Sequence, residues 1–386
     1  MKPFASIPEQ IPRSGIREVM ELAWAVEKTG EVIHLEVGQP DFDTPAHIVE
    51  ATCRLVRDGQ TKYVPNAGVD PLREAAARYF ERNTGVATTP DHILVTPGAV
   101  MSVASSFLAL LEPGDEVLLP DPGWPNYHMA VSIVHGQPVF YNLRAENHFL
   151  PDLAEIESLV SSKTKLILLC TPSNPTGQVY DEALMRELMA LAQRHDLWVL
   201  SDEIYGEIVF DDKHHSALPH DEDGRALIVS GMSKSYAMTG YRVGFTRANP
   251  DYIELAAKLQ EPFVSCGTGF SQLASAEALD GPQESVEMMR EAYRRRRDIA
   301  LDVLRAYDLY HYTPGGAIYL MIDISASGID SHAFAIKLLE ERRVAVAPGQ
   351  TFGKMCANHI RISIAAADDH IRRGVTAICE LVREGG

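Results

Sequence analysis

Two apolar runs, Leu166–Cys170 (LILLC) and Leu197–Leu200 (LWVL), decide the fold of this chain. Neither run alternates with polar residues, so each predicts a strand that is buried on both faces of a sheet. Glu182–Arg194, which lies between them, carries leucines at helical spacing. A strand, a helix and a second strand in this order predict a parallel pair with a right-handed crossover and helices on both faces of the sheet.

The same alternation continues along most of the chain. Seven runs are expected to be strands of one sheet: His92–Thr96, Glu116–Leu119, Pro138–Leu143, Lys165–Cys170, Trp198–Ser201, Leu227–Ser230 and Val243–Arg247. Near residue 280 the pattern changes, and a long helix, 283–305, leads into a shorter series of elements. The strands expected in that series are Ala317–Ile324, Val344–Ala347 and His359–Ser363.

We therefore predict an α/β protein with two domains. Residues 46–280 would form a large domain, whose mainly parallel seven-stranded sheet is flanked by helices. Residues 281–386 would form a smaller α+β domain, and residues 1–45 an N-terminal arm and part of that small domain. In sheets of this kind, ligands bind at the C-terminal ends of the strands.

Composition narrows the class of partner. The 386 residues carry a net charge of −18, which argues against nucleic acid and anionic membranes, because both attract basic surfaces.

The five scattered cysteines form no CxxC pair, so we expect neither a disulfide framework nor a metal site. The first residues lack the apolar segment of a signal peptide, and no run has the length of a membrane span, so we expect a cytoplasmic protein. Arg294–Arg297 follows glutamates at helical spacing and predicts a solvated helix face.

Polar residues and tight turns follow several of the predicted strands. Thr96–Val100 is a turn of small residues that opens a helix, where free N–H groups can bind a phosphate. Trp124 and Asp202 follow two later strands; taken alone, the first could be a core residue and the second a helix N-cap. Lys234 stands between two serines after the strand Leu227–Ser230, and Arg242 follows it.

These groups together fit the chemistry of pyridoxal phosphate, which withdraws electrons from the α-carbon of an amino acid. The protein must supply a lysine for the Schiff base, a carboxylate opposite the ring nitrogen, a phosphate cup and an aromatic ring that stacks on the cofactor. Lys234, Asp202, the 98–100 turn with Arg242, and Trp124 are of the right types for these four tasks.

Ten short motifs extend this interpretation over nearly the whole chain. In chain order they are SGIREV, EVGQPDFDTP, YVPNAGVDPLR, TPGA, DPGWPNY, SNPTG, SDEIY, SKSYAMTGYRVG, GGAIY and HIRISIA. With these motifs the chain resembles the class I/II aminotransferases, which are pyridoxal-phosphate enzymes of fold type I. Within that family it is similar to the branch of bacterial aspartate and aromatic aminotransferases.

The resemblance implies a role for each matching residue around the cofactor. Lys234 would form the Schiff base and, once the substrate displaces it, move a proton between the α-carbon and the cofactor. Asp202 would pair with the ring nitrogen and Tyr205 with the 3-oxygen of the ring; with Lys234 they form the catalytic set. Asn174 would lie beside that oxygen, and Trp124 would stack on the ring.

The resemblance also implies how the phosphate is held. The backbone amides of Ala99 and Val100, together with Arg242, would hold the cofactor phosphate, and Tyr63 would reach the phosphate of the neighbouring subunit. The expected assembly is therefore a homodimer with its active sites at the subunit interface. Ser233 would contribute to the phosphate cup as well, because Gly231 stands where some relatives have a phosphate-binding serine.

The resemblance further implies how the substrate is held. Arg361 would clamp the substrate α-carboxylate in a bidentate manner, with Asn174 and Trp124 beside it and the backbone of Gly38 beneath the substrate. Val100 stands where aspartate-using relatives carry a lysine, which favours a neutral, aromatic or aliphatic amino donor. We expect ping-pong transamination to a 2-oxo acid such as 2-oxoglutarate. A pyridoxal-phosphate lyase, of the C–S lyase type, is the alternative on the same fold.

Overall fold

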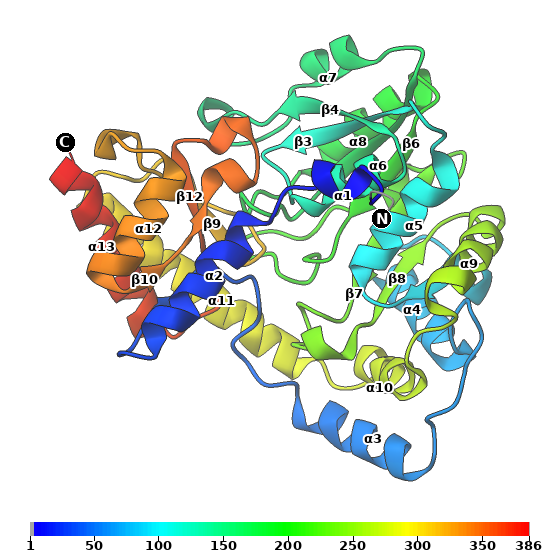
Figure 1. Ribbon diagram of the computed structural model, residues 1–386. Coiled ribbons are helices and arrows are strands. Elements are labelled where there is room, and N and C mark those ends of the chain that lie inside the picture. Colours follow the sequence, from blue (N-terminus) through cyan, green and yellow to red (C-terminus); the bar gives the residue numbers. More distant parts are fainter. Residues whose placement is uncertain (1–3, 386) are drawn as a thin grey trace.

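The structure is a computed structural model that describes residues 4–385 (Figure 1). Residues 1–3 of the expected N-terminal arm, and residue 386 of the expected small domain, lie outside the described residues. Within them, one large sheet with its helices lies beside a second group of short strands and helices, and the long helix α11 (Glu284–Ala306) runs from one group to the other (Figure 1).

The large sheet has seven strands in the order β2-β8-β7-β6-β5-β3-β4. Their bounds are β2 (Ile93–Thr96), β3 (Glu116–Asp121), β4 (Gln137–Asn142), β5 (Thr164–Cys170), β6 (Trp198–Asp202), β7 (Ala226–Gly231) and β8 (Gly244–Arg247). Strand β8 is antiparallel to both of its neighbours, and the other pairs are parallel. The predicted α/β class and the mainly parallel seven-stranded sheet are confirmed, and each strand lies within a few residues of its predicted run.

Helices cover both faces of this sheet. The bounds are α3 (Ala46–Arg57), α4 (Asp70–Thr84), α5 (Ala99–Leu110), α6 (Asn126–Ile133), α7 (Leu153–Leu159), α8 (Glu182–Arg194), α9 (Pro250–Val264) and α10 (Gly269–Asp280). In β5, Leu166 and Leu168 pack into the core under α5, α6 and α9, whereas Ile167 and Leu169 pack into the core under α4, α7, α8 and α10. The uninterrupted apolar run is therefore buried on both faces, as its sequence predicts.

The second group of elements holds two small sheets. Its elements are α2 (Gly15–Glu27), β1 (Ile33–His34), β9 (Tyr319–Asp323), α12 (Ser331–Arg342), β10 (Val344–Ala345), β11 (Ala347–Pro348), β12 (His359–Ser363) and α13 (Asp368–Gly385). The short helix α1 (Ile7–Gln10) precedes them in the chain and lies against α6 of the large-sheet group (Figure 1). Strands β11, β12 and β9 form an antiparallel sheet in that order, and β1 pairs in parallel with β10. The single strand predicted at Val344–Ala347 is wrong, because the chain leaves one sheet after Ala345 and joins the other at Ala347.

Single-turn 3-10 helices complete the connections. They lie at Pro90–His92, Ala145–Asn147, Leu218–His220, Thr239–Tyr241, Ser325–Ser327, Gly349–Thr351 and Lys354–Cys356. None of the helices within residues 4–385 combines the length and the apolar character needed to cross a membrane.

The solvated face predicted for Arg294–Arg297 is wrong for half of the run. Arg296 and Arg297 are only 6% and 5% exposed, because α11 packs against other elements on two sides. Arg296 donates to both oxygens of Asp41 at 2.8 Å and to Asp368 at 3.2 Å. The glutamates at helical spacing indicated surface pairs, but the partners of the buried arginines come from distant segments of the chain.

This difference within one run can be tested by comparing Arg296→Leu with Arg294→Leu. The first substitution removes a buried cation and leaves two partly buried carboxylates without it, so we expect a loss of about 2 to 3 kcal/mol in the free energy of unfolding by urea. Among the described residues, Arg294 pairs only with Glu291, and both side chains are close to half exposed. Its replacement should cost no more than about 0.5 kcal/mol. Equal losses in the two variants would contradict the interpretation.

Candidate active site

Most of the predicted site residues meet beyond the C-terminal ends of β5, β6 and β7. Asn174, Asp202 and Lys234 follow or end these three strands. Arg361 arrives from β12 in the small antiparallel sheet and contacts Asn174, and Gly38 arrives from the segment after β1 and contacts Lys234. The site is therefore built between the two groups of elements.

Lys234 is half-buried, and its amine has a defined partner. Nζ donates to the carbonyl oxygen of Gly38 at 2.6 Å and lies 5.9 Å from the centre of the Tyr205 ring. Gly38 has no room for a side chain, since a Cβ there would lie 1.9 Å from the Tyr319 hydroxyl. The backbone of Gly38 can thus approach the amine closely, and a glycine is required at that position.

Asp202 is the last residue of β6 and is 4% exposed. Tyr127 donates to its Oδ2 at 2.6 Å, and the backbone N–H of Ile204 donates to Oδ1 at 3.2 Å. Burial raises the pKa of the carboxyl group, while the bond from Tyr127 lowers it. Tyr127 was not predicted as a site residue, although it stands in the DPGWPNY motif, one helical turn after Trp124.

A phosphate-sized cradle lies at the start of α5. Gly98 is the N-cap residue with φ +83°, and a Cβ there would lie 2.4 Å from Nη2 of Arg242. The guanidinium of Arg242 therefore lies against the turn, held by a 3.0 Å bond from Nη1 to the carbonyl of Thr239. The N–H groups of Ala99 and Val100 belong to the first helical turn, which leaves them without acceptors in the helix. Together these donors and the cation fit a phosphate.

Arg361 is 2% exposed and lies between two aromatic rings. The guanidinium carbon is 4.3 Å from the centre of the Tyr319 ring and 4.7 Å from that of Phe352. Nη1 donates to Oδ1 of Asn174 at 3.1 Å, and Nη2 donates to the carbonyl oxygen of Glu36. Nε is buried without a hydrogen-bond partner. A planar cation with an unused donor is suited to binding a carboxylate.

Tyr205 pairs with a second tyrosine rather than standing alone. Its hydroxyl lies 2.6 Å from that of Tyr319, and the two rings meet edge to face at 5.6 Å. Burial raises the pKa of Tyr205, so its hydroxyl stays protonated and can act as a donor. Tyr319 was not predicted as a site residue either. It belongs to the GGAIY motif, but in the sequence it looks like an ordinary buried residue of a strand.

The remaining predicted residues lie close to this cluster or at the surface. Trp124 is half-buried, with its ring edge to face with Tyr127 at 5.4 Å. Ser233 is buried beside Lys234, and Val100 is 37% exposed in the first turn of α5. Tyr63 is 91% exposed between α3 and α4, so its predicted contact with a second subunit remains a prediction.

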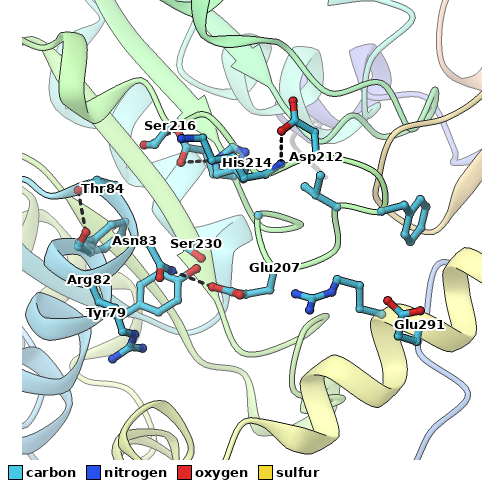
Figure 2. A pocket seen from close by; sticks show the side chains of 17 residues that line it. Tyr79, Arg82, Asn83, Thr84, Glu207, Asp212, His214, Ser216, Ser230 and Glu291 are labelled. Atoms are coloured by element: carbon cyan, nitrogen blue, oxygen red, sulfur yellow. Dashed lines mark hydrogen bonds and ion pairs between the residues drawn. The ribbon is translucent and has the colours of Figure 1, made fainter.

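A separate cavity of about 500 Å³ lies between α4, the segment after β6 and α11 (Figure 2). None of the predicted site residues lines it. The carboxylate of Glu203 beside it accepts bonds from Ser201, Ser216, Ala217 and His214 at 2.7 to 3.1 Å, so it serves to hold the 214–217 segment. Among residues 4–385, no group of three His, Cys, Asp or Glu side chains is placed to hold a metal ion.

Comparison with known proteins gives one consistent result. The sequence profile described as aminotransferase class I and II matches residues 30–378. The chain is 37% identical over 370 residues, 95% of either chain, to the putative aminotransferase YugH of Bacillus subtilis. It superposes with a TM-score of 0.94 on the aspartate aminotransferase of Thermus thermophilus with maleate, at 34% identity, covering 99% of this chain and 100% of that one. The aromatic aminotransferase of Pyrococcus horikoshii superposes with a TM-score of 0.89 at 35% identity, covering 96% and 99%.

The cradle at α5 can be tested with Gly98→Ala. The added Cβ would displace the Arg242 guanidinium and force an alanine to positive φ, so we expect apoprotein to bind pyridoxal phosphate at least tenfold more weakly, with a stability loss of about 1 to 3 kcal/mol. Gly85→Ala is the matched control, because Gly85 has φ +75° but no neighbouring atom within 4 Å of the place that a Cβ would take. It should lose stability through backbone strain and keep its cofactor affinity. Equal affinities in the two variants would contradict the assignment of the cradle.

Proposed function

The chain belongs to the class I and II aminotransferase family, whose members depend on pyridoxal phosphate, and from this premise we propose its substrates and the roles of its residues. The amino donor is a neutral, aromatic or aliphatic L-amino acid, the acceptor is a 2-oxo acid such as 2-oxoglutarate, and the two half-reactions follow a ping-pong order. The observation that carries this proposal is the buried guanidinium of Arg361, whose Nε is without a partner at a site that also contains Lys234.

Pyridoxal phosphate supplies an electron sink that stabilises negative charge at the substrate α-carbon. We assign Lys234 as the amine that binds the cofactor covalently and then carries the proton to and from the α-carbon. Its present position, 2.6 Å from the Gly38 carbonyl, supports this role, because that contact holds the amine at the site. Asp202 is assigned to the ring nitrogen, with Tyr127 orienting its carboxylate. Tyr205 is assigned to the ring 3-oxygen, where its protonated hydroxyl can donate.

The other residues bind rather than react. Ala99, Val100 and Arg242 are assigned to the cofactor phosphate because they line the cradle at α5, and the buried Ser233 is assigned to the same phosphate. Trp124 is assigned to the ring face. Arg361 and Asn174, which are joined by a 3.1 Å hydrogen bond, are assigned to the substrate α-carboxylate.

Val100 supports the proposed class of donor. Its side chain is apolar, is 37% exposed, and stands in the first turn of α5, where it offers no charge to a second carboxylate on the substrate. The names of similar proteins do not decide this point, since one is an aspartate and another an aromatic aminotransferase. An uncharged contact at this position favours donors with uncharged side chains.

A homodimer that shares its active sites is the proposed assembly. Tyr63 is 91% exposed, and α3 and α9 also carry exposed apolar side chains: Val49, Val56 and Phe263. An open cavity of about 480 Å³ lies beside Arg242, between the 42–44 segment and α10. We propose that a second copy covers these apolar side chains and that its Tyr63 enters this cavity to reach the phosphate.

The donor class can be tested in a half-reaction without a keto acid. We expect aromatic and aliphatic L-amino acids to release close to one equivalent of keto acid per active site with a matching change in the cofactor absorbance, and aspartate to react at least tenfold more slowly. Lys234→Ala should give no keto acid. Repeated turnover with release of ammonia would instead establish a lyase, and a faster reaction with aspartate would overturn the proposed donor class.

The shared site can be tested by mixing two variants of low activity, Lys234→Ala and Tyr63→Ala. A mixed dimer contains one site with both wild-type residues, because Lys234 and Tyr63 of that site come from different chains. Equal amounts that are unfolded and refolded together should recover about a quarter of wild-type activity, since half of the dimers are mixed and each has one intact site. Activity equal to the mean of the two parents would contradict the shared site.

A further inference from the structure

A row of charged groups leads from the surface to Arg361. His34, at the end of β1, contacts two carboxylates: Nδ1 lies 2.8 Å from Oε1 of Glu36, and Nε2 lies 3.6 Å from Oε2 of Glu27 on α2. Glu36 is fully buried, whereas the His34 side chain is 30% exposed. The backbone carbonyl of Glu36 accepts the bond from Nη2 of Arg361.

The pairing of the small sheets places these groups together. β1 lies beside β10, and the chain after it runs along β12, where the N–H of Ser363 donates to the carbonyl of Leu35 at 2.7 Å. Arg361 stands on β12, two residues before Ser363. The same segment then reaches Gly38, whose carbonyl contacts Lys234. Residues 34–38 therefore connect a surface histidine with both proposed functional cations.

Two atoms of opposite charge are left without hydrogen bonds in this region. Oε2 of Glu36 and Nε of Arg361 are both buried and have no partner. Burial lowers the pKa of the Arg361 guanidinium, and Tyr319, Tyr205 and, after them, the charge of Glu36 act against this effect. Glu36 is the one carboxylate among the charges that act on Arg361 within residues 4–385. The carboxylate of Glu36 contacts His34 directly, whereas its charge reaches Arg361 only through space, because the direct contact with Arg361 is made by the backbone carbonyl.

We propose that Glu36 is a positioning residue for the carboxylate clamp, shared between His34 and Arg361, so that the protonation of His34 sets the charge that a substrate carboxylate meets. This inference rests on the proposed role of Arg361. With His34 protonated, His34 and Arg361 together carry one positive charge more than the buried Glu36, and the substrate carboxylate neutralises that excess. Glu27 is left out of this count because its side chain is 50% exposed, so that solvent and salt screen its charge. With His34 neutral, Glu36 already balances Arg361, and a carboxylate gains less on binding.

The direction of the pH dependence follows from this balance. The hydrogen bond with Glu36 raises the pKa of His34, partial burial opposes the shift, and the charges of Glu36 and Glu27 add to it. Among residues 4–385, these two carboxylates are the charged groups within 4 Å of the His34 ring nitrogens. His34 therefore keeps its proton to a higher pH than an ordinary histidine. Affinity for a carboxylate should be highest below this raised pKa and should fall as the pH rises through it.

The test measures the Kd of 3-phenylpropionate, an unreactive carboxylate, for the holoenzyme through the cofactor absorbance over the pH range in which histidines titrate. In the wild type, we expect the Kd to rise about fivefold with pH. His34→Gln should show the weak, high-pH value throughout. Glu36→Gln should bind tightly and lack the His34-dependent rise. His195→Gln breaks a His–Glu contact of the same 2.8 Å length at the surface and should follow the wild type.

The outcomes separate this inference from the proposed function. Arg361→Lys should weaken binding at every pH; if it does not, the assignment of Arg361 itself fails. If Arg361→Lys weakens binding but His34→Gln and Glu36→Gln keep the wild-type pH profile, the shared role of Glu36 is wrong. Because the His34 side chain is partly exposed, His34→Gln still tests the proposal if Glu36→Gln does not fold. Urea unfolding of each variant identifies such a loss of folding.

Discussion

The burial of the large sheet on both faces is the constraint on which the rest of the structure depends. Ile167 and Leu168 are neighbours in β5 but belong to different cores, so the buried run Leu166–Cys170 offers no place for a charge. Charged groups stand instead where the strands end, as Asp202 and Lys234 do. Helix α5 begins at the same edge and adds its free N–H groups. The hydrophobic pattern thus decides where the chemistry takes place.

The small antiparallel sheet supplies the buried arginine of the site, Arg361. Arg361 is carried by β12, yet its guanidinium is held by Asn174 from the large-sheet side and by the Glu36 carbonyl from the N-terminal segment. A cation so deeply buried is stable only when such acceptors surround it. The proposed binding of the substrate carboxylate would therefore depend on the docking of three segments that are far apart in the sequence, and loss of any one of them would leave polar groups unpaired.

The sequence predicted the strands of the large sheet and most of the residues that the structure brings together at their ends, because apolar runs and turn residues are local features. It did not predict Tyr127 or Tyr319, whose hydroxyls meet partners 75 and 114 residues away. Both lie inside recognised motifs but look like ordinary apolar packing residues. The sequence did not single out Glu36 for a related reason, since its contact with Arg361 comes from a strand more than three hundred residues further on. The prediction of a solvated face for Arg294–Arg297 was wrong for Arg296 and Arg297. Glutamates at helical spacing indicate pairs on the helix surface, but the sequence does not show that an arginine pairs instead with a carboxylate from a distant segment.

The buried arginines of α11 also bear on how the enzyme responds to salt. Arg296 holds Asp41, which closely follows Gly38, so this ion pair helps to fix the segment that contacts Lys234. Dissolved ions screen exposed charges well but reach a side chain that is 7% exposed far less. Raising the ionic strength should therefore weaken the ion pairs at the surface of this acidic protein, whose net charge is −18, more than it weakens the Arg296–Asp41 pair. The position of the segment that contacts Lys234 should change little with salt.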